Sequence, residues 1–175
     1  MIENYRLLMA ATLALGLPMG ASATEKAPES CTAPVQPEGP LAAWENPVEL
    51  QAAGKDRDLA AAKLPVGQAA RVALLQTPEV RYALRPEKPG GSVSYGGMVA
   101  FSVAEAGTYR VALGSGAWVD IVADGKAAIS TAHGHGPACT GIRKMVDFAL
   151  EPGDYILQIA ANGAPQANVL IASIP

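Results

Sequence analysis

The sequence predicts an all-β fold, a jelly-roll-like antiparallel β-sandwich of about nine strands, on the basis of three observations. Apolar and polar residues alternate with a period of two in several short runs, as they do in half-buried strands. Turn-forming residues separate these runs at intervals of roughly ten residues, the spacing of small sandwiches and barrels. No long segment of the sequence shows the apolar period of an amphipathic helix.

Residues 1–23 have the organisation of a secretory signal peptide. Arg6 lies in a short polar start, an apolar run extends from Leu7 to Leu17, and Ala21-Ser22-Ala23 places small residues where signal peptidase cuts. The apolar run is shorter than the roughly 20 residues that cross a bilayer as a helix. We therefore expect cleavage before Thr24, export to the periplasm or the medium, and no membrane span. An uncleaved N-terminal anchor is the alternative.

The charge of the chain argues against two classes of partner. The formal net charge is −3, and it is spread along the chain. The sequence has neither a basic patch suited to nucleic acid nor a polybasic run suited to anionic lipid. We expect no nucleic-acid partner, and the ligand or protein partner of the chain stays unidentified at this stage.

Residues 24–64 are expected to form a proline-rich arm and an irregular segment. Five prolines lie between Thr24 and Pro47, and this density disfavours a helix and predicts an extended chain. Leucines and alanines in residues 48–64 could form a broken helix, but Gly54 and the charged run 55–58 interrupt it. Trp44 is expected to dock the arm onto the domain.

Residues 65–175 are expected to form the sandwich domain. Asp124-Gly125 between two strand-like runs predicts a two-residue hairpin, because a type I′ turn needs a positive φ at both positions. A loop rich in proline and glycine covers residues 86–97, and turns are expected at residues 151–154 and 162–163. The expected strands are 71–75, 80–84, 99–104, 109–113, 119–123, 126–131, 142–150, 155–159 and 170–174.

The alternating runs also predict which side chains form the core. Residues on the apolar face of each run should point inward, because side chains alternate between the two faces of a strand. The expected core residues are Val99, Phe101, Tyr109, Val111, Val119, Ile121, Phe148, Leu157 and Ile159.

Cys31 and Cys139 are the two cysteines of the chain. An even number of cysteines in an exported protein favours a disulfide. This bond would close a loop of about a hundred residues and contribute roughly 4–5 kcal/mol in the chain-entropy model. The alternative keeps Cys139 free as a metal ligand.

Both histidines lie in the segment His133-Gly134-His135-Gly136-Pro137-Ala138-Cys139. Residues two apart share one face of a strand, so His133 and His135 could bind one metal ion. Imidazole and thiolate suit Zn²⁺ or copper, and Cys139 or a carboxylate, Asp120 or Asp147, would complete the site. The alternative is a glycine-rich loop at the rim of the sandwich whose imidazoles form hydrogen bonds.

Four further residues have a functional and a structural interpretation. Arg143 and Lys144 could hold an anionic ligand beside the histidines, or Arg143 could be a solvent-facing residue of the strand, with Lys144 at its frayed start. Trp118 and Tyr95 could stack on a sugar, or pack in the core. The sequence contains no Gly-x-Ser-x-Gly motif and no glycine-rich loop that would cradle a phosphate ahead of a helix.

Two phrases, Gly107-Thr108-Tyr109 and Glu151-Pro152-Gly153-Asp154-Tyr155-Ile156-Leu157, resemble those of the bacterial pre-peptidase C-terminal domain. The resemblance covers residues 64–173. It implies a non-catalytic sandwich module.

The segment from His133 to Lys144 is similar to one in small secreted bacterial proteins that carry the label homogentisate 1,2-dioxygenase. Members of that enzyme family have a cupin fold and bind ferrous iron through two histidines and a glutamate. His133-x-His135 resembles the first cupin motif, and residues 152–154 with 163–168 resemble the second. Gln166 stands where the second motif has its histidine, and Ala138-Cys139-Thr140 stands where the glutamate is expected.

The sequence therefore supports two hypotheses of function. The first is a periplasmic, non-enzymatic binding or accessory domain that binds zinc or copper through the His-Gly-His loop. The alternative, implied by the second resemblance, is a cupin-like, iron-dependent oxygenase.

Overall fold

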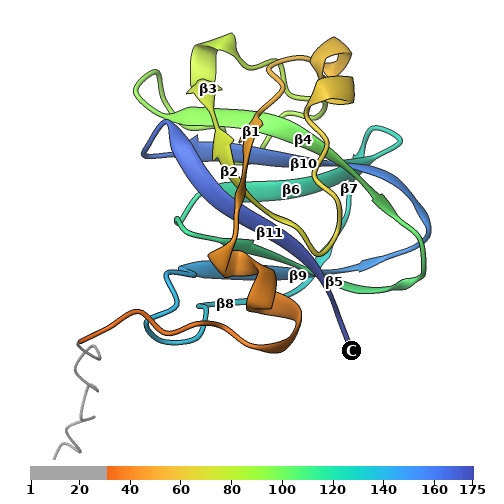
Figure 1. The fold of residues 1–175 in the computed structure, drawn as a ribbon. Helices are drawn as coiled ribbons and strands as arrows, with labels where there is room; N and C mark the ends of the chain where they lie inside the picture. The colour runs from red at the N-terminus through yellow and green to blue at the C-terminus, as the bar shows by residue number, and fades with distance from the viewer. Residues whose placement is uncertain (1–30) are drawn as a thin grey trace, which may run out of the picture.

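The protein is a β-sandwich (Figure 1). The computed structural model describes residues 31–175, so the expected signal peptide and its cleavage site lie outside the described residues. Two sheets pack face to face and contain eleven strands, two more than expected. The predicted fold class is confirmed.

The larger sheet has six strands in the order β1-β2-β11-β5-β9-β8. β1 and β2 pair in parallel, and the other neighbours in this sheet are antiparallel. Its strands are β1 (Val48–Gln51), β2 (Ala69–Ala73), β5 (Gly107–Leu113), β8 (Ser130–Gly134), β9 (Lys144–Leu150) and β11 (Gln166–Ile174).

The smaller sheet has five antiparallel strands in the order β3-β4-β10-β6-β7. Its strands are β3 (Leu75–Gln76), β4 (Tyr95–Val103), β6 (Trp118–Ala123), β7 (Lys126–Ala127) and β10 (Gly153–Asn162). Three short 3₁₀ helices complete the described chain, namely η1 (Gly39–Glu45), η2 (Asp56–Ala61) and η3 (Thr77–Glu79). Within residues 31–175, no helix is long and apolar enough to cross a membrane.

The core lies between the two sheets and confirms the predicted inward faces. All nine expected core residues are at most 7% exposed. They belong to one apolar cluster to which both sheets contribute. Alternation therefore predicted the register of these strands correctly.

Two tyrosines close turns in the same way. The hydroxyl of Tyr109 donates to the carbonyl oxygen of Glu105 at 2.8 Å, and that of Tyr155 donates to Glu151 at 2.9 Å. In each case the acceptor lies four residues before the tyrosine, across the turn that precedes the strand. Such tyrosine corners are known in other β-sandwiches. They give a structural reason for the two Gly-x-Tyr phrases of the sequence.

The hairpin predicted at Asp124-Gly125 is confirmed, but the return strand is shorter than expected. Asp124 has φ 50° and Gly125 has φ 69°, and Ala123 pairs directly with Lys126. The expected strand 126–131 divides into β7 and β8, which belong to different sheets. The chain crosses between the sheets at residues 128 and 129.

The expected strand 80–84 is wrong: no strand includes these residues, and the backbone groups of Ala83 and Leu84 bond to side chains. The amide of Gln158 accepts from the Leu84 N–H and donates to the Leu84 carbonyl, both at 3.0 Å. The N–H of Ala83 points to the sulfur of Met98 at 3.3 Å. This segment therefore packs across β4 and β10 without joining the ladder.

The region before residue 65 is more ordered than expected. Pro40 lies in the first turn of η1, where its missing N–H costs nothing, so the proline-rich arm contains a short helix. Residues 48–64, expected to be irregular, contain β1 and η2. Trp44 docks the arm as predicted, since it is 5% exposed and packs with Leu41 against Ala112 and Leu170 of the six-stranded sheet.

Candidate functional site

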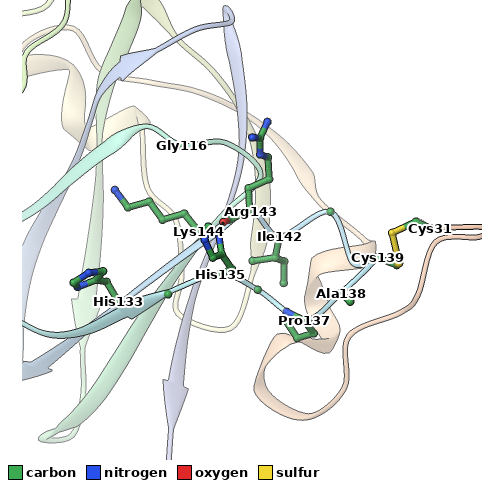
Figure 2. Close-up of a pocket in the computed structure, with 13 residues that line it drawn as sticks. Cys31, Gly116, His133, His135, Pro137, Ala138, Cys139, Ile142, Arg143 and Lys144 are labelled. Atoms are coloured by element: carbon green, nitrogen blue, oxygen red, sulfur yellow. Dashed lines mark hydrogen bonds between the residues drawn. A yellow bond between two sulfur atoms is a disulfide. The ribbon is translucent and has the colours of Figure 1, made fainter. Parts of the chain in front are cut away.

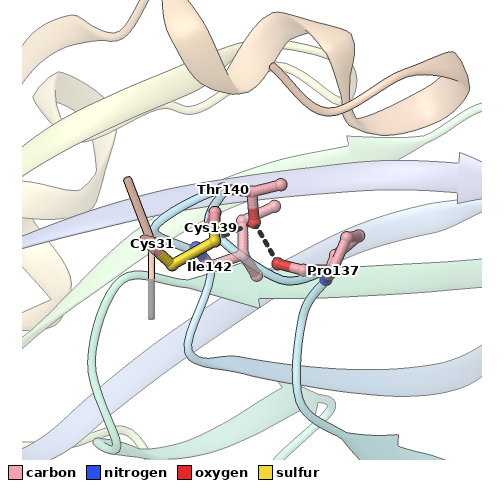
Figure 3. The surroundings of a disulfide bond; sticks show 5 residues. All are labelled: Cys31, Pro137, Cys139, Thr140 and Ile142. Carbon is pink, nitrogen blue, oxygen red and sulfur yellow. Dashed lines mark hydrogen bonds between the residues drawn. A yellow bond between two sulfur atoms is a disulfide. The ribbon is translucent and has the colours of Figure 1, made fainter. Parts of the chain in front are cut away.

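The disulfide between Cys31 and Cys139 is present, with Cα atoms 5.4 Å apart, and it confirms the predicted pairing (Figure 3). The bond joins the arm to the loop that follows the two histidines. A disulfide sulfur is not a thiolate, and the thiolate is the form that binds metal. The interpretation of Cys139 as a metal ligand is therefore corrected for the oxidised protein.

Hydrogen bonds fix the same loop on both sides of Cys139. The carbonyl of Cys139 accepts from the Val35 N–H at 2.9 Å, and that of Thr140 accepts from Trp44 Nε1 at 3.0 Å. The hydroxyl of Thr140 donates to the Pro137 carbonyl at 2.8 Å and accepts from the Ile142 N–H at 3.3 Å (Figure 3). The loop is thus held as a rigid platform at one end of the sandwich.

The two histidines lie on an exposed edge of the molecule. His133 is in β8, the edge strand of the six-stranded sheet, and all five residues of β8 are exposed. His133 pairs with Val146 on β9. Directly paired residues share one face of a sheet, and Val146 is buried in the core, so His133 lies on the inward face, at the mouth of the sandwich.

The ring of His135 is oriented by the backbone. Its Nδ1 lies 3.0 Å from the carbonyl oxygen of Arg143 (Figure 2). Because a carbonyl only accepts, Nδ1 carries the proton in this contact, and the lone pair of the neutral ring is on Nε2. This is the arrangement of metal-binding histidines, whose second nitrogen donates to a carbonyl or carboxylate.

Arg143 and Lys144 do not act on one side of the strand. Figure 2 shows their side chains diverging, with Arg143 just before β9 and Lys144 at its first position. Arg143 is exposed, whereas Lys144 is partly buried and its Nζ donates to the Ala117 carbonyl at 2.8 Å. Both side chains line a depression of about 640 Å³ beside the loop, together with His133 and His135.

A second depression, the edge cleft, lies where the two sheets separate. β7 pairs only with Val122 and Ala123, so the first half of β6 has no strand beside it on that side in the described chain. The cleft of about 440 Å³ follows this free edge and reaches the core. It is lined by Glu87, Trp118, Val119, Asp120, Ala128, Ile129, Ser130, His133, Lys144, Val146 and Phe148.

Trp118 organises the polar rim of the edge cleft. Its Nε1 donates to Asp120 Oδ1 at 2.9 Å. The ammonium groups of Lys88 and Lys144 lie over its ring, 5.1 and 5.6 Å from the centroid. Trp118 is therefore neither a core residue nor a bare platform for a sugar, since two cations already contact its ring.

Burial shifts the titration of the groups around this indole. Desolvation raises the pKa of Asp120, although hydrogen bonds from Trp118 and Gln158 oppose the shift. Desolvation and the nearby charge of Lys88 lower the pKa of Lys144. Burial, with a contribution from Asp120, raises the pKa of Tyr82 to about 12. Both charged groups thus lose hydration in the cleft.

The described residues gather few metal ligands. Between residues 31 and 175, no three His, Cys, Asp or Glu side chains are grouped closely enough to hold one ion. Asp147 is engaged by Arg110, with both carboxylate oxygens accepting hydrogen bonds at 2.7 Å. Asp120 lines the edge cleft with His133 and accepts from Trp118. Metal binding stays a prediction that rests on the two imidazoles.

The positions that resemble the two cupin motifs are not adjacent. His133 lies on β8, and Gln166 begins β11. The strands β9 and β5 separate these two strands in the sheet.

Some residues of the edge cleft could not be identified from the sequence. Glu87 and Lys88 lie in a loop rich in proline and glycine, and no local pattern connects them with Trp118. Only the fold brings the three together.

Comparison with known proteins adds no relative. No protein-family model matches the chain, and no curated protein matches its sequence. The proposal of function therefore depends on the fold and on the geometry of the site.

Proposed function

We propose that this protein is a periplasmic, non-enzymatic binding domain whose His-Gly-His loop binds a zinc or copper ion through His133 and His135. The contact between His135 Nδ1 and the Arg143 carbonyl carries the proposal, because it directs the metal-binding lone pair of Nε2 away from the protein. The disulfide suits an oxidising compartment such as the periplasm.

The exposure of the loop supports binding rather than catalysis. His133 and His135 are open to solvent at the edge of a β-sandwich. Enzymes commonly exclude water from the reacting groups, whereas an ion bound at this open edge would stay accessible to a partner. Two imidazoles leave coordination positions of the ion open, so a ligand or partner group can complete the shell.

The test is calorimetric titration of the mature, oxidised protein with Zn²⁺. We expect one ion per chain at neutral pH, and a loss of affinity of about tenfold or more in His133→Ala and in His135→Ala. Affinity should fall at acid pH, because the metal needs neutral imidazole. Asp124→Asn, on the exposed hairpin turn, is the matched control and should bind as the wild type does. Equal affinity in all four proteins would refute the metal site.

A further inference from the structure

The edge cleft contains charges of both signs that are not paired with one another. Asp120 and Glu87 line the cleft with Lys144, and Lys88 lies over the same indole as Lys144. No nitrogen–oxygen contact within 4.0 Å joins these lysines to these carboxylates in the described part of the chain. Trp118 contacts both lysines and Asp120, and Lys144 and Asp120 attract each other without forming an ion pair.

Two of these charges are partly buried. Asp120 has side-chain hydrogen bonds with Trp118 Nε1 and with Gln158, and Lys144 donates one to the Ala117 carbonyl. A carboxylate has about four acceptor sites and an ammonium has three donors, so both groups keep unused capacity. Their pKa shifts, upward for Asp120 and downward for Lys144, show that burial disfavours both charges. A ligand that supplies the opposite charges would stabilise both groups.

The inner part of the cleft is apolar. Val119 of β6 and Val146 and Phe148 of β9 line it, and all three belong to the core between the sheets. The volume of about 440 Å³ lies in the range of small-ligand sites. An apolar group that entered between β6 and β8 would contact these residues and cover Ile129, which also lines the cleft and is 88% exposed, so apolar surface would be removed from water.

We propose that the edge cleft binds a small zwitterion, a free amino acid with an apolar side chain. The ligand carboxylate contacts the Lys144 ammonium, the ligand ammonium contacts Asp120, and the side chain contacts Val119 and Phe148. This inference rests on the proposed role as a binding domain and requires no metal ion.

A zwitterion fits the cleft better than an ion of either sign. A simple anion would contact Lys144 but would be repelled by Asp120 and Glu87, and a simple cation would be repelled by the two lysines. The ligand ammonium can also replace Lys88 over the Trp118 ring. The contact of Lys88 is weak, because this lysine is exposed to solvent.

The experiment titrates the mature, oxidised protein in EDTA with three probes of one shape. L-leucine carries both charges, 4-methylpentanoate lacks the ammonium, and 3-methylbutylamine lacks the carboxylate. We expect L-leucine to bind about tenfold or more tightly than either analogue, since each analogue loses a charge-assisted hydrogen bond. The Nε1–H resonance of Trp118, identified by its loss in Trp118→Phe, should shift on binding and so report the location.

Two variants assign the charges. Asp120→Asn should weaken L-leucine but not 4-methylpentanoate, which loses a repulsion, whereas Lys144→Met should weaken L-leucine but not 3-methylbutylamine, which also loses a repulsion. Asp124→Asn and Lys126→Met, on the neighbouring hairpin, are the matched controls and should bind L-leucine as the wild type does. In either cleft variant without ligand, a Trp118 Nε1–H resonance that stays away from its position in the urea-unfolded protein verifies that the cleft is folded, since the substitutions themselves alter contacts of the indole.

Several results would overturn the inference. Equal binding of L-leucine and 4-methylpentanoate would make the cleft an anion site, and binding of maltose but not L-leucine would make it a sugar site. No shift of the Trp118 resonance with any probe would exclude a ligand site there. Because EDTA is present, each result is independent of Zn²⁺ binding by the histidines, which the separate titration decides.

Discussion

The indole Nε1 of Trp44 donates to the carbonyl oxygen of Thr140 at 3.0 Å, across a separation of 96 residues. Thr140 directly follows Cys139, and Cys139 forms the disulfide with Cys31. The arm therefore reaches this loop through three connections: the disulfide, the hydrogen bond from the Val35 N–H to the Cys139 carbonyl, and the buried hydrogen bond of Trp44. The proline-rich segment is a structural support for the proposed metal site rather than a linker.

Removing the disulfide should destabilise the protein but preserve the fold. In Cys31→Ser/Cys139→Ser the unfolded chain regains the freedom of a loop with a sequence separation of 108 residues. The chain-entropy model gives a loss of about 4–5 kcal/mol in the free energy of unfolding. Urea unfolding measures the loss, with the reduced wild type as the control. A change below about 1 kcal/mol would mean that Trp44 alone fixes the arm.

Trp44 should be the second determinant of arm docking. Trp44→Ala removes a buried indole and should cost about 3–5 kcal/mol. Trp44→Phe keeps most of the packing but leaves the Thr140 carbonyl without its donor, and should cost about 1–3 kcal/mol. Urea unfolding of the two variants separates packing from the hydrogen bond. If both cost the same, the packing of the ring contributes nothing beyond the hydrogen bond, and if Trp44→Phe costs nothing, the hydrogen bond does not stabilise the docked arm.

Gly136 should be essential to the conformation of the segment 133–139, whereas Gly134 should tolerate a side chain. A Cβ atom at Gly136 would collide with the Ile142 carbonyl oxygen and lie 2.5 Å from Ile142 Cβ, whereas one at Gly134 would meet nothing within 4 Å. Gly136→Ala should therefore displace the loop and lower both stability and Zn²⁺ affinity. Gly134→Ala is the matched control in the same loop. Equal Zn²⁺ affinity in the two variants would show that the loop adapts and that its exact path is unimportant.

The strands that the sequence predicted correctly are those with local signals. Val119 and Ile121 face the core, so the alternation of apolar and polar residues predicts their strand. Asp124-Gly125 favours the positive φ values that its turn requires. The even number of cysteines and the expected oxidising compartment were enough to pair Cys31 with Cys139. In each case the deciding information lies within a few residues or in the composition of the chain.

The features that could not be predicted depend on distant contacts. Residues 80–84 look like a strand, but the side chain of Gln158, 74 residues away, bonds to both backbone groups of Leu84, and the Arg81 N–H donates to the Gly54 carbonyl. The edge cleft is similar, because Lys88 and Lys144 meet at Trp118 only after β6 and β9 are placed in different sheets. A single sequence carries no local signal for contacts between residues so far apart in the chain.

Export should remove the first 23 residues, a prediction that falls outside the described part of the chain. Small residues at Ala21 and Ala23 direct cleavage before Thr24. The intact mass of protein from a periplasmic extract, after expression of the full chain in a Gram-negative host, should correspond to a start at Thr24. Ala23→Phe should block processing, and Ala42→Phe, in the mature chain, is the control. Periplasmic protein that starts at Met1 would overturn the prediction.

The stability of the protein should depend on the ionisation of Asp120. Burial raises the pKa of this carboxyl above its ordinary value of 3.8, so the folded state holds the proton more tightly than the unfolded state. The stability that this group contributes is therefore present below the ordinary pKa, and it is lost as the pH rises through the raised one. Asp120→Asn cannot ionise and keeps an oxygen that accepts from Trp118 Nε1. Urea unfolding at a series of pH values should show that the free energy of unfolding of Asp120→Asn increases relative to that of the wild type between pH 3.8 and neutrality. If the free energy of unfolding of the variant instead decreases relative to the wild type over this range, the ionised carboxylate stabilises the fold. Its hydrogen bonds with Trp118 and Gln158 would then outweigh the cost of burial.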